Sequence, residues 1–155
     1  MNRRDRKGRK EGFVDLTAKA AEDAKEVEKK MTENEISKVL IGCAIDVHKE
    51  LGPGLLESTY EVCLEYELKE HGLDVQRQLI LPVNYKGKLI DAGYRIDLMI
   101  NEKVIVELKA VEEMTKVHEA QVITYLKLSG INLGFLINFN ETYLKNGIKR
   151  LVNNF

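Results

Sequence analysis

The sequence predicts an α/β domain in which a mixed central β-sheet is flanked by helices, with the elements in the order ααββββαβ. Three observations support this class. Apolar residues recur at helical spacing after Thr32, short strand-like apolar runs follow one another between residues 75 and 110, and a further helix and strand pattern occupies residues 116–139. The chain of 155 residues suits one domain with a sizeable core. Strands and helices in such an order form layered α/β or α+β domains.

The first helix is predicted to begin after Thr32 and to end before Gly52. Thr32 and Glu35 form a T-x-x-E capping box, which marks a helix N-terminus. Apolar residues then recur at helical spacing: Ile36, Val39, Leu40, Cys43, Ala44, Val47 and Leu51. The sequence Gly52-Pro53-Gly54 breaks the helix and separates it from the next one.

The remaining elements are short and are bounded by turn residues. In chain order they are a helix over residues 56–71, strands over 75–81, 83–90, 94–100 and 104–110, a helix over 116–129 and a strand over 133–139. The Lys86-Gly87 pair can interrupt the second strand, and residues 148–154 can add a last edge strand.

Charge is unevenly distributed along the chain. Residues 1–30 contain 10 Lys or Arg and 7 Asp or Glu, with few large apolar side chains. We expect them to form a flexible leader outside the folded domain, which would comprise residues 31–155. The rest of the chain is slightly acidic. Binding of nucleic acid by bulk electrostatics is therefore not expected, and any contact with phosphates would be local or assisted by a metal.

The sequence also bears on location. No apolar run approaches the roughly 18 residues that a membrane span needs, so no membrane partner is expected. Cys43 and Cys63 fall at apolar helix positions and form neither a disulfide framework nor a zinc-binding spacing. Buried free thiols of this kind favour the reducing cytoplasm.

The apolar strand 104–110 carries two opposite charges on one face. Side chains alternate along a strand, so Glu107 and Lys109 point the same way. Asp97 lies one strand earlier. If residues 101–103 form the connecting loop, Asp97 lies opposite Glu107, with Cβ atoms about 4.5–5.5 Å apart. A two-residue loop would shift this pairing by one residue.

Two carboxylates at that separation repel each other unless a cation or a proton lies between them. Carboxylate oxygens suit Mg²⁺ or Mn²⁺, which retain several waters and leave room for a substrate phosphate. Lys109 could hold the attacking water or neutralise charge in the transition state. The alternative is a solvated sheet face on which a Glu–Lys pair contributes little.

Two helical pairs are further candidates. Glu57 and Tyr60 lie three residues apart and share a helix face, although a first-turn glutamate favoured by the helix dipole explains Glu57 equally well. Gln121 and Tyr125 lie four residues apart on the third helix. They either seal a polar site or lie at the boundary of the core.

One combination of motifs resembles a known family. The stretch "GPGLLESTY" contains Gly54-x-x-Glu57-x-x-Tyr60, which resembles the GxxExxY protein family, and "RIDLMI", "VIVELKA", "EAQVITYLKLSG" and "GFLINF" extend the resemblance over most of the chain after Thr32. That family is placed in the PD-(D/E)XK nuclease superfamily. The resemblance therefore implies a restriction-endonuclease-like core.

The resemblance also implies roles for individual residues. Asp97 matches the aspartate of the PD element, with Ile96 in place of the proline, and Glu107 and Lys109 match the (D/E)-x-K element. Glu57 resembles the helical acidic residue beside the metal in many members. Gln121 and Tyr125 resemble the Q-x-x-x-Y element, which would position phosphate or support the lysine.

The metal set implied in this way comprises Asp97, Glu107, the backbone carbonyl of Leu108 and Glu57, the last orienting a water beside the metal. The reaction would be hydrolysis of phosphodiester bonds with Mg²⁺, or alternatively Mn²⁺, and the substrate would be nucleic acid, with DNA favoured over RNA. Two other readings stay open, because fold does not determine function. One is a non-catalytic binding or accessory module on the same fold, and the other is a structural homodimer.

Overall fold

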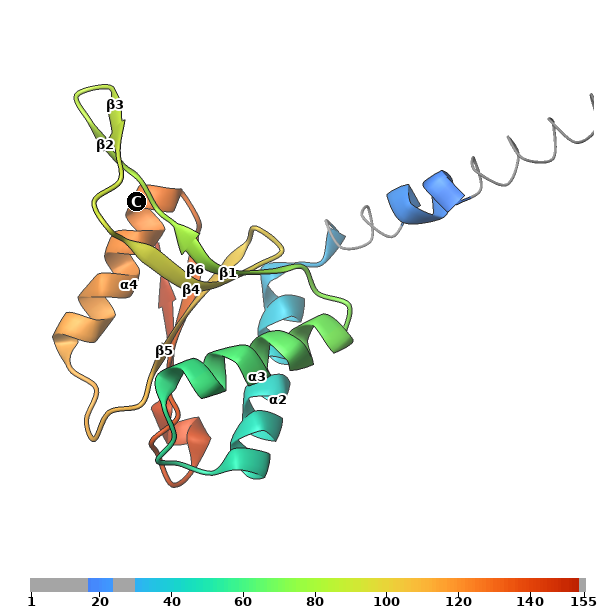
Figure 1. The fold of residues 1–155 in the computed structure, drawn as a ribbon, viewed down its shortest axis with the longest axis vertical. Coiled ribbons are helices and arrows are strands. Elements are labelled where there is room, and N and C mark those ends of the chain that lie inside the picture. Colours follow the sequence, from blue (N-terminus) through green and yellow to red (C-terminus); the bar gives the residue numbers. More distant parts are fainter. Residues whose placement is uncertain (1–16, 24–29, 154–155) are drawn as a thin grey trace, which may run out of the picture. The chain divides into compact units, whose positions relative to one another are not determined.

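A five-stranded mixed sheet in the order β1-β4-β5-β6-β7 forms the centre of the folded domain (Figure 1). Its strands are β1 (Val75–Ile80), β4 (Arg95–Ile100), β5 (Val104–Lys109), β6 (Leu133–Asn138) and β7 (Ile148–Val152). Strands β5 and β6 are parallel, and the other neighbours are antiparallel. The structure, a computed structural model, describes residues 17–23 and 30–153. The prediction of a mixed central sheet is confirmed.

Helices cover both faces of this sheet (Figure 1). Helices α2 (Glu33–Leu51) and α3 (Glu57–Glu70) lie on one face, and α4 (Lys116–Ser129) lies on the other. The hydroxyl of Thr32 accepts the backbone N–H of Glu35 at 3.1 Å, as the capping motif predicts. No helix among residues 17–23 and 30–153 is long and apolar enough to span a membrane.

The α4 face of the sheet contains a continuous apolar core. It is formed by eight buried residues, namely Leu81, Ile96, Met99, Ile105, Val122, Tyr125, Leu126 and Leu136. Gly134 allows α4 to approach β6 closely, because a Cβ at this position would lie only 2.8 Å from Cγ1 of Val122. Helix α4 therefore packs closely on β6, the strand next to β5, and also contacts β5.

The other face is built from apolar stripes of α2 and α3. Fully or nearly fully buried residues include Ile36, Leu40, Ala44, Tyr60, Leu64 and Leu68. These helices also contact β4 and β5. The sheet is consequently buried on both sides around β5, which explains why that strand is apolar at most positions.

One predicted strand is not part of the central sheet. Residues 83–90 form a separate hairpin of β2 (Val83–Tyr85) and β3 (Lys88–Ile90). Lys86 and Gly87 form its turn with φ of 52° and 82°, the left-handed geometry typical of two-residue hairpin loops. The interruption predicted at these two residues is therefore confirmed, and five strands rather than the predicted four precede α4.

The predicted leader is only partly visible. Of residues 1–30, residues 17–23 form an exposed helical segment and residue 30 is also described, whereas the others lie outside the described residues. A domain boundary at residue 31 therefore stays a prediction. At the other end of the chain, the predicted edge strand is present as β7, which pairs with β6.

Candidate active site

The hairpin of β4 and β5 brings Asp97 and Glu107 together. Its register pairs Ile100 with Val104, which confirms the predicted three-residue loop, and extending the register places Asp97 opposite Glu107. At this pair of residues, hydrogen bonds from backbone N–H groups to side-chain carboxyl groups take the place of the backbone–backbone hydrogen bonds between the two strands. The N–H of Asp97 donates to Oε1 of Glu107 at 3.1 Å, and the N–H of Leu108 donates to Oδ2 of Asp97 at 2.9 Å. Each carboxylate is thus oriented by the backbone of the opposite strand.

Burial makes this pair of carboxyl groups unusual. Glu107 is only 3% exposed. Its pKa is raised to about 9, first by burial and then by the negative charge of Asp97. Near neutral pH Glu107 therefore retains its proton, which lowers the electrostatic repulsion in the space between the two groups. A divalent cation in that space would replace the proton and neutralise both carboxylates.

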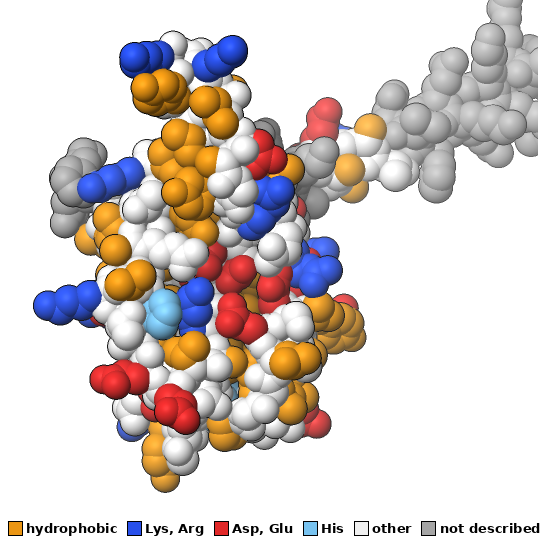
Figure 2. Space-filling model, turned by 60° about the vertical axis from the view of Figure 1, so that its left-hand side comes forward, with side chains coloured by type: hydrophobic (Ala, Val, Ile, Leu, Met, Phe, Trp, Pro, Cys, Tyr) orange, Lys and Arg blue, Asp and Glu red, His pale blue; other side chains and the backbone are white. Residues whose placement is uncertain are grey.

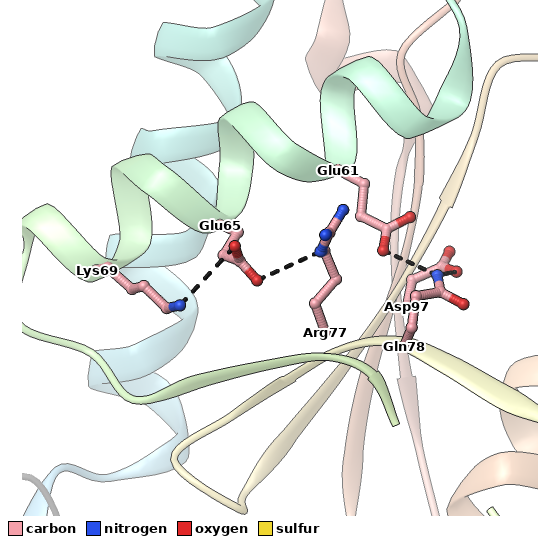
Figure 3. A network of polar contacts seen from close by, with 6 residues as sticks. All are labelled: Glu61, Glu65, Lys69, Arg77, Gln78 and Asp97. Carbon is pink, nitrogen blue, oxygen red and sulfur yellow. Dashed lines mark hydrogen bonds and ion pairs between the residues drawn. The ribbon is translucent and has the colours of Figure 1, made fainter. Parts of the chain in front are cut away.

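A third acidic residue joins the pair through an amide that the sequence did not indicate. Nε2 of Gln78 donates to Oε1 of Glu61 at 2.8 Å and to Oδ1 of Asp97 at 3.1 Å (Figure 3). Glu61 is 7% exposed, and its pKa is raised chiefly by burial. The spacing of Glu57 and Glu61, four residues apart on one helix, is the signal that could have identified Glu61.

The backbone of β1 is distorted at Gln78 to allow this contact. Gln78 has φ of 55°, in the left-handed region that a strand residue rarely adopts. As a result two consecutive side chains reach α3, because Arg77 pairs with Glu65 at 3.5 Å while Gln78 binds Glu61 (Figure 3). In a regular strand these side chains would point to opposite faces. Such backbone strain persists only where the surrounding contacts compensate for it, as the hydrogen bonds of Gln78 to Glu61 and Asp97 do here.

Glu57 is the first residue of α3, and the charged groups of the site affect its pKa. Burial raises its pKa, whereas the positive charge of Lys109 and the backbone N–H of Ala110 lower it, and the charge of Asp97 raises it further. His118 of α4 also lowers this pKa. Glu57 is therefore close enough to both the acidic pair and the lysine to interact with them electrostatically.

Tyr60 explains how the loop before Glu57 is held. Its ring is fully buried and stacks on Phe139 with centroids 4.5 Å apart. Its hydroxyl donates to the carbonyl of Gly52 and accepts the N–H of Leu55 at 3.1 Å. Tyr60 thus stabilises the loop, and its hydroxyl faces that loop.

Lys109 ends β5 on a firmly held backbone. Its carbonyl accepts the N–H of Phe139 at 2.8 Å. Val111 follows Lys109 by two residues. The side chain of Asn138, which is fully buried, accepts the N–H of Val111 and donates to its carbonyl. Lys109 takes part in none of the ion pairs among the described residues. Its ammonium group is therefore available to an incoming group.

Gln121 and Tyr125 approach the pair from α4. Nε2 of Gln121 donates to the hydroxyl of Tyr125 at 2.9 Å. Tyr125 is 3% exposed, and its pKa is raised by burial and then by Glu107. Both residues line a cavity of about 420 Å³ together with Tyr94 and exposed residues of α4. All six side chains predicted for the site therefore belong to one region.

The acidic side chains gather at the centre of one face, with basic and histidine side chains beside them (Figure 2). Among residues 17–23 and 30–153, no group of three His, Cys, Asp or Glu side chains is arranged as a metal cluster. Asp97 and Glu107 nevertheless fit Mg²⁺, which commonly binds one or two carboxylates, several waters and a substrate phosphate. The structure does not place Glu57 as a third direct ligand.

The fold and this arrangement of carboxylates and lysine define a domain of the restriction-endonuclease-like class. Residues 34–151 match the family model of the PD-(D/E)XK nuclease superfamily. The chain belongs to this superfamily. No curated protein and no solved structure matches the sequence.

Proposed function

We propose that this protein is a divalent-metal-dependent nuclease that hydrolyses phosphodiester bonds in DNA, and that within its superfamily it is a GxxExxY protein. The observation that carries the proposal is the Asp97–Glu107 pair, in which backbone N–H groups at 2.9 and 3.1 Å orient a half-buried and a buried carboxyl group near Lys109, which takes part in no ion pair among the described residues. A purely structural domain has no need to bury Glu107 against a second acid, because such burial is costly unless a proton or a cation compensates for it.

Each residue has a role that follows from its position. Asp97 and Glu107 would bind Mg²⁺ or Mn²⁺, and the carbonyl of Leu108 lies on the same strand as a further oxygen ligand. The metal would polarise the phosphoryl group and stabilise its developing charge. Lys109 would hold the attacking water or neutralise negative charge, and Glu57 would accept a hydrogen bond from that water.

Gln121 and Tyr125 would complete the site from the α4 side. Their mutual hydrogen bond leaves the second N–H of the amide directed to other partners, and this donor suits a phosphate oxygen. Gln78 would hold Asp97 in the orientation that metal binding requires.

The test is metal-dependent cleavage of labelled DNA and RNA substrates by the wild type and by Lys109→Ala, with Lys49→Ala as a control on an exposed lysine of α2. We expect cleavage with Mg²⁺ or Mn²⁺ by the wild type and the control, and a loss of about 10²-fold or more in Lys109→Ala. Circular dichroism would show that all three are folded. Equal cleavage by Lys109→Ala and the control would refute the assignment.

A non-catalytic accessory module is the second candidate, and one observation favours it. Without metal, the Asp97–Glu107 pair is already satisfied by the proton that Glu107 retains and by two backbone N–H groups. Titration calorimetry with Mn²⁺ separates the two candidates, because a nuclease is expected to bind the ion in the wild type and to lose it in Glu107→Ala.

We further propose a cytoplasmic location, because both cysteines are free thiols and Cys43 is buried. A homodimer stays an expectation, and sedimentation at several protein concentrations tests it.

A further inference from the structure

The β2–β3 hairpin projects beyond the sheet as a continuation of the strands that carry the candidate site (Figure 1). The N–H of Leu81 donates to the carbonyl of Tyr94 at 3.0 Å, so the β1–β4 pairing continues past Ile80 toward the hairpin. Gln78 lies on one strand of this pair and Asp97 on the other. The hairpin is therefore attached to the site by a hydrogen-bonded stalk.

The hairpin exposes an unusual amount of apolar surface. Tyr85 is 60% exposed, Leu89 71% and Ile90 42%. Tyr85 and Ile90 lie on one face of the hairpin and Leu89 lies on the other, and exposed large apolar side chains that neighbour one another mark an interaction surface. The hairpin does not bury these side chains in a core of its own, so a binding partner explains their presence better.

The charges on the same hairpin favour a particular partner. Lys86 and Lys88 are exposed, and neither takes part in an ion pair among the described residues. Nζ of Lys86 lies 5.4 Å from the centre of the Tyr85 ring. The type of turn presents Lys86 at the tip, since both turn residues have positive φ. An aromatic ring flanked by two unpaired cations is the combination with which proteins hold a nucleic acid strand.

The register separates the two faces of the hairpin. Asn84 pairs with Leu89, and both line a cavity of about 600 Å³ that lies toward the sheet and α4. Tyr85 pairs with Lys88 and therefore shares the opposite face with it. The aromatic ring and one lysine are thus presented together on the face away from that cavity.

The distance from the site is also suitable. Tyr85 follows Gln78 by about seven residues, which span at most about 23 Å in extended chain. One strand of a duplex presents a phosphate about every 3.4 Å, so this reach covers at most about seven nucleotides. Lys and Arg side chains at the top of the molecule and acidic side chains at its centre appear on the same face (Figure 2).

We propose that the β2–β3 hairpin is an arm that binds the nucleic acid substrate beside the cleaved bond. Lys86 and Lys88 contact phosphates, and Tyr85 stacks on a base or sugar. The inference rests on the proposed nuclease function and adds the surface that holds the substrate. Such a surface is needed, because the acidic centre of the site repels phosphates and the domain carries a slight negative charge.

The experiment compares the full chain with three variants in binding and cleavage of a fluorescent DNA duplex, its single strand and an RNA strand of the same sequence. Binding is measured with Ca²⁺ at several salt concentrations. The variants are Lys86→Ala/Lys88→Ala, Tyr85→Ala and the matched control Lys38→Ala/Lys49→Ala on α2. All the substituted side chains are exposed, so the fold is expected to persist, and thermal melting checks this.

We expect the hairpin lysine variant to bind duplex more weakly and to lower the slope of log affinity against log salt by about 1.8, since two phosphate contacts are lost. Tyr85→Ala should weaken binding of the single strand by about fivefold or more, because stacking on a base is lost. Both should raise KM and leave kcat unchanged. The control should behave as the wild type.

If the hairpin variants and the control all bind and cleave nucleic acid as strongly as the wild type, the hairpin inference is overturned and the nuclease function stands. Failure of the wild type to bind or cleave any of the three probes would overturn both. Sedimentation could instead show that Tyr85→Ala loses self-association while its binding of nucleic acid is unchanged. The hairpin would then be a contact with a second copy of this chain, and the inference would also be overturned.

Discussion

Glu107→Gln is expected to stabilise the folded protein above about pH 6 while it abolishes metal binding and cleavage. The substitution retains the size of the side chain. The amide oxygen can still accept the N–H of Asp97, and the amide N–H₂ can donate to the Asp97 carboxylate in place of the proton that the acid retains. The variant therefore resembles the protonated form of Glu107, which is the form that burial favours.

The size of the effect follows from the pKa. Glu107 has a pKa of about 9 in the folded protein against 4.5 as its ordinary value. Between these values the folded state holds one proton more than the unfolded state. Stability consequently falls as pH rises, by about 1.4 kcal/mol per pH unit from this group. At pH 8 the wild type should be less stable than the variant by at most about 5 kcal/mol, and below pH 4.5 the difference should vanish.

The assay is urea denaturation of both proteins at intervals from pH 4.5 to pH 8.5 in the presence of a chelator. Glu57 and Glu61 also have a raised pKa and contribute a slope of the same sign, but they do so in both proteins, so the difference between the two curves isolates Glu107. Adding Mn²⁺ at pH 8 should then raise the stability of the wild type alone, because only the carboxylate binds the ion.

Parallel stability curves for the two proteins across this pH range would refute the reasoning, since they would show that Glu107 titrates as an exposed acid does. A variant that is less stable at every pH would refute it as well. In that case the carboxylate itself, rather than its protonated form, would be the species that the fold requires.

Three further predictions concern the surroundings of the site. Gln78→Ala and Gln78→Gly should both lower kcat, because Asp97 loses its amide partner. In urea denaturation the Gly variant should be more stable than the Ala variant by about 1 kcal/mol, because glycine adopts the left-handed φ without strain. Equal stability of the two variants would show that the backbone is not strained. Tyr60→Phe should cost about 1 kcal/mol of unfolding free energy, because the carbonyl of Gly52 and the N–H of Leu55 lose a part-buried hydrogen-bond partner, and an unchanged urea midpoint would contradict this. Gly134→Ala should cost about 1–3 kcal/mol through its contact with Val122; Val122→Ala in the same chain should reduce that cost, and additive costs would argue against the contact.

Much of the local structure could be predicted because it depends on neighbours in the sequence. Thr32 begins α2 through a hydrogen bond to a residue three positions away, and glycines end the long helices. Alternation along β5 placed Glu107 and Lys109 on one face. A three-residue loop then sufficed to place Asp97 opposite Glu107, since this contact is made within one hairpin.

Other features depend on contacts between distant segments, and the sequence pattern could not supply them. Residues 83–90 have strand composition whether they join the central sheet or leave it as a hairpin, and only the packed structure shows that they leave it. Glu61 lies one turn after Glu57 on α3, a spacing that makes it a candidate, but this spacing does not show that Glu61 is buried beside Gln78.

The sequence by itself thus determined the class of fold, the helix ends and the acidic pair with its lysine, because each follows from local periodicity, capping or one short loop. Only the tertiary structure decided that Gln78 joins Glu61 to Asp97. That contact requires a left-handed residue within β1, which breaks the alternation that sequence reasoning relies on, and it requires α3 to lie across the same strand. The strain is local, but what compensates for it is the packing of segments far apart in the chain.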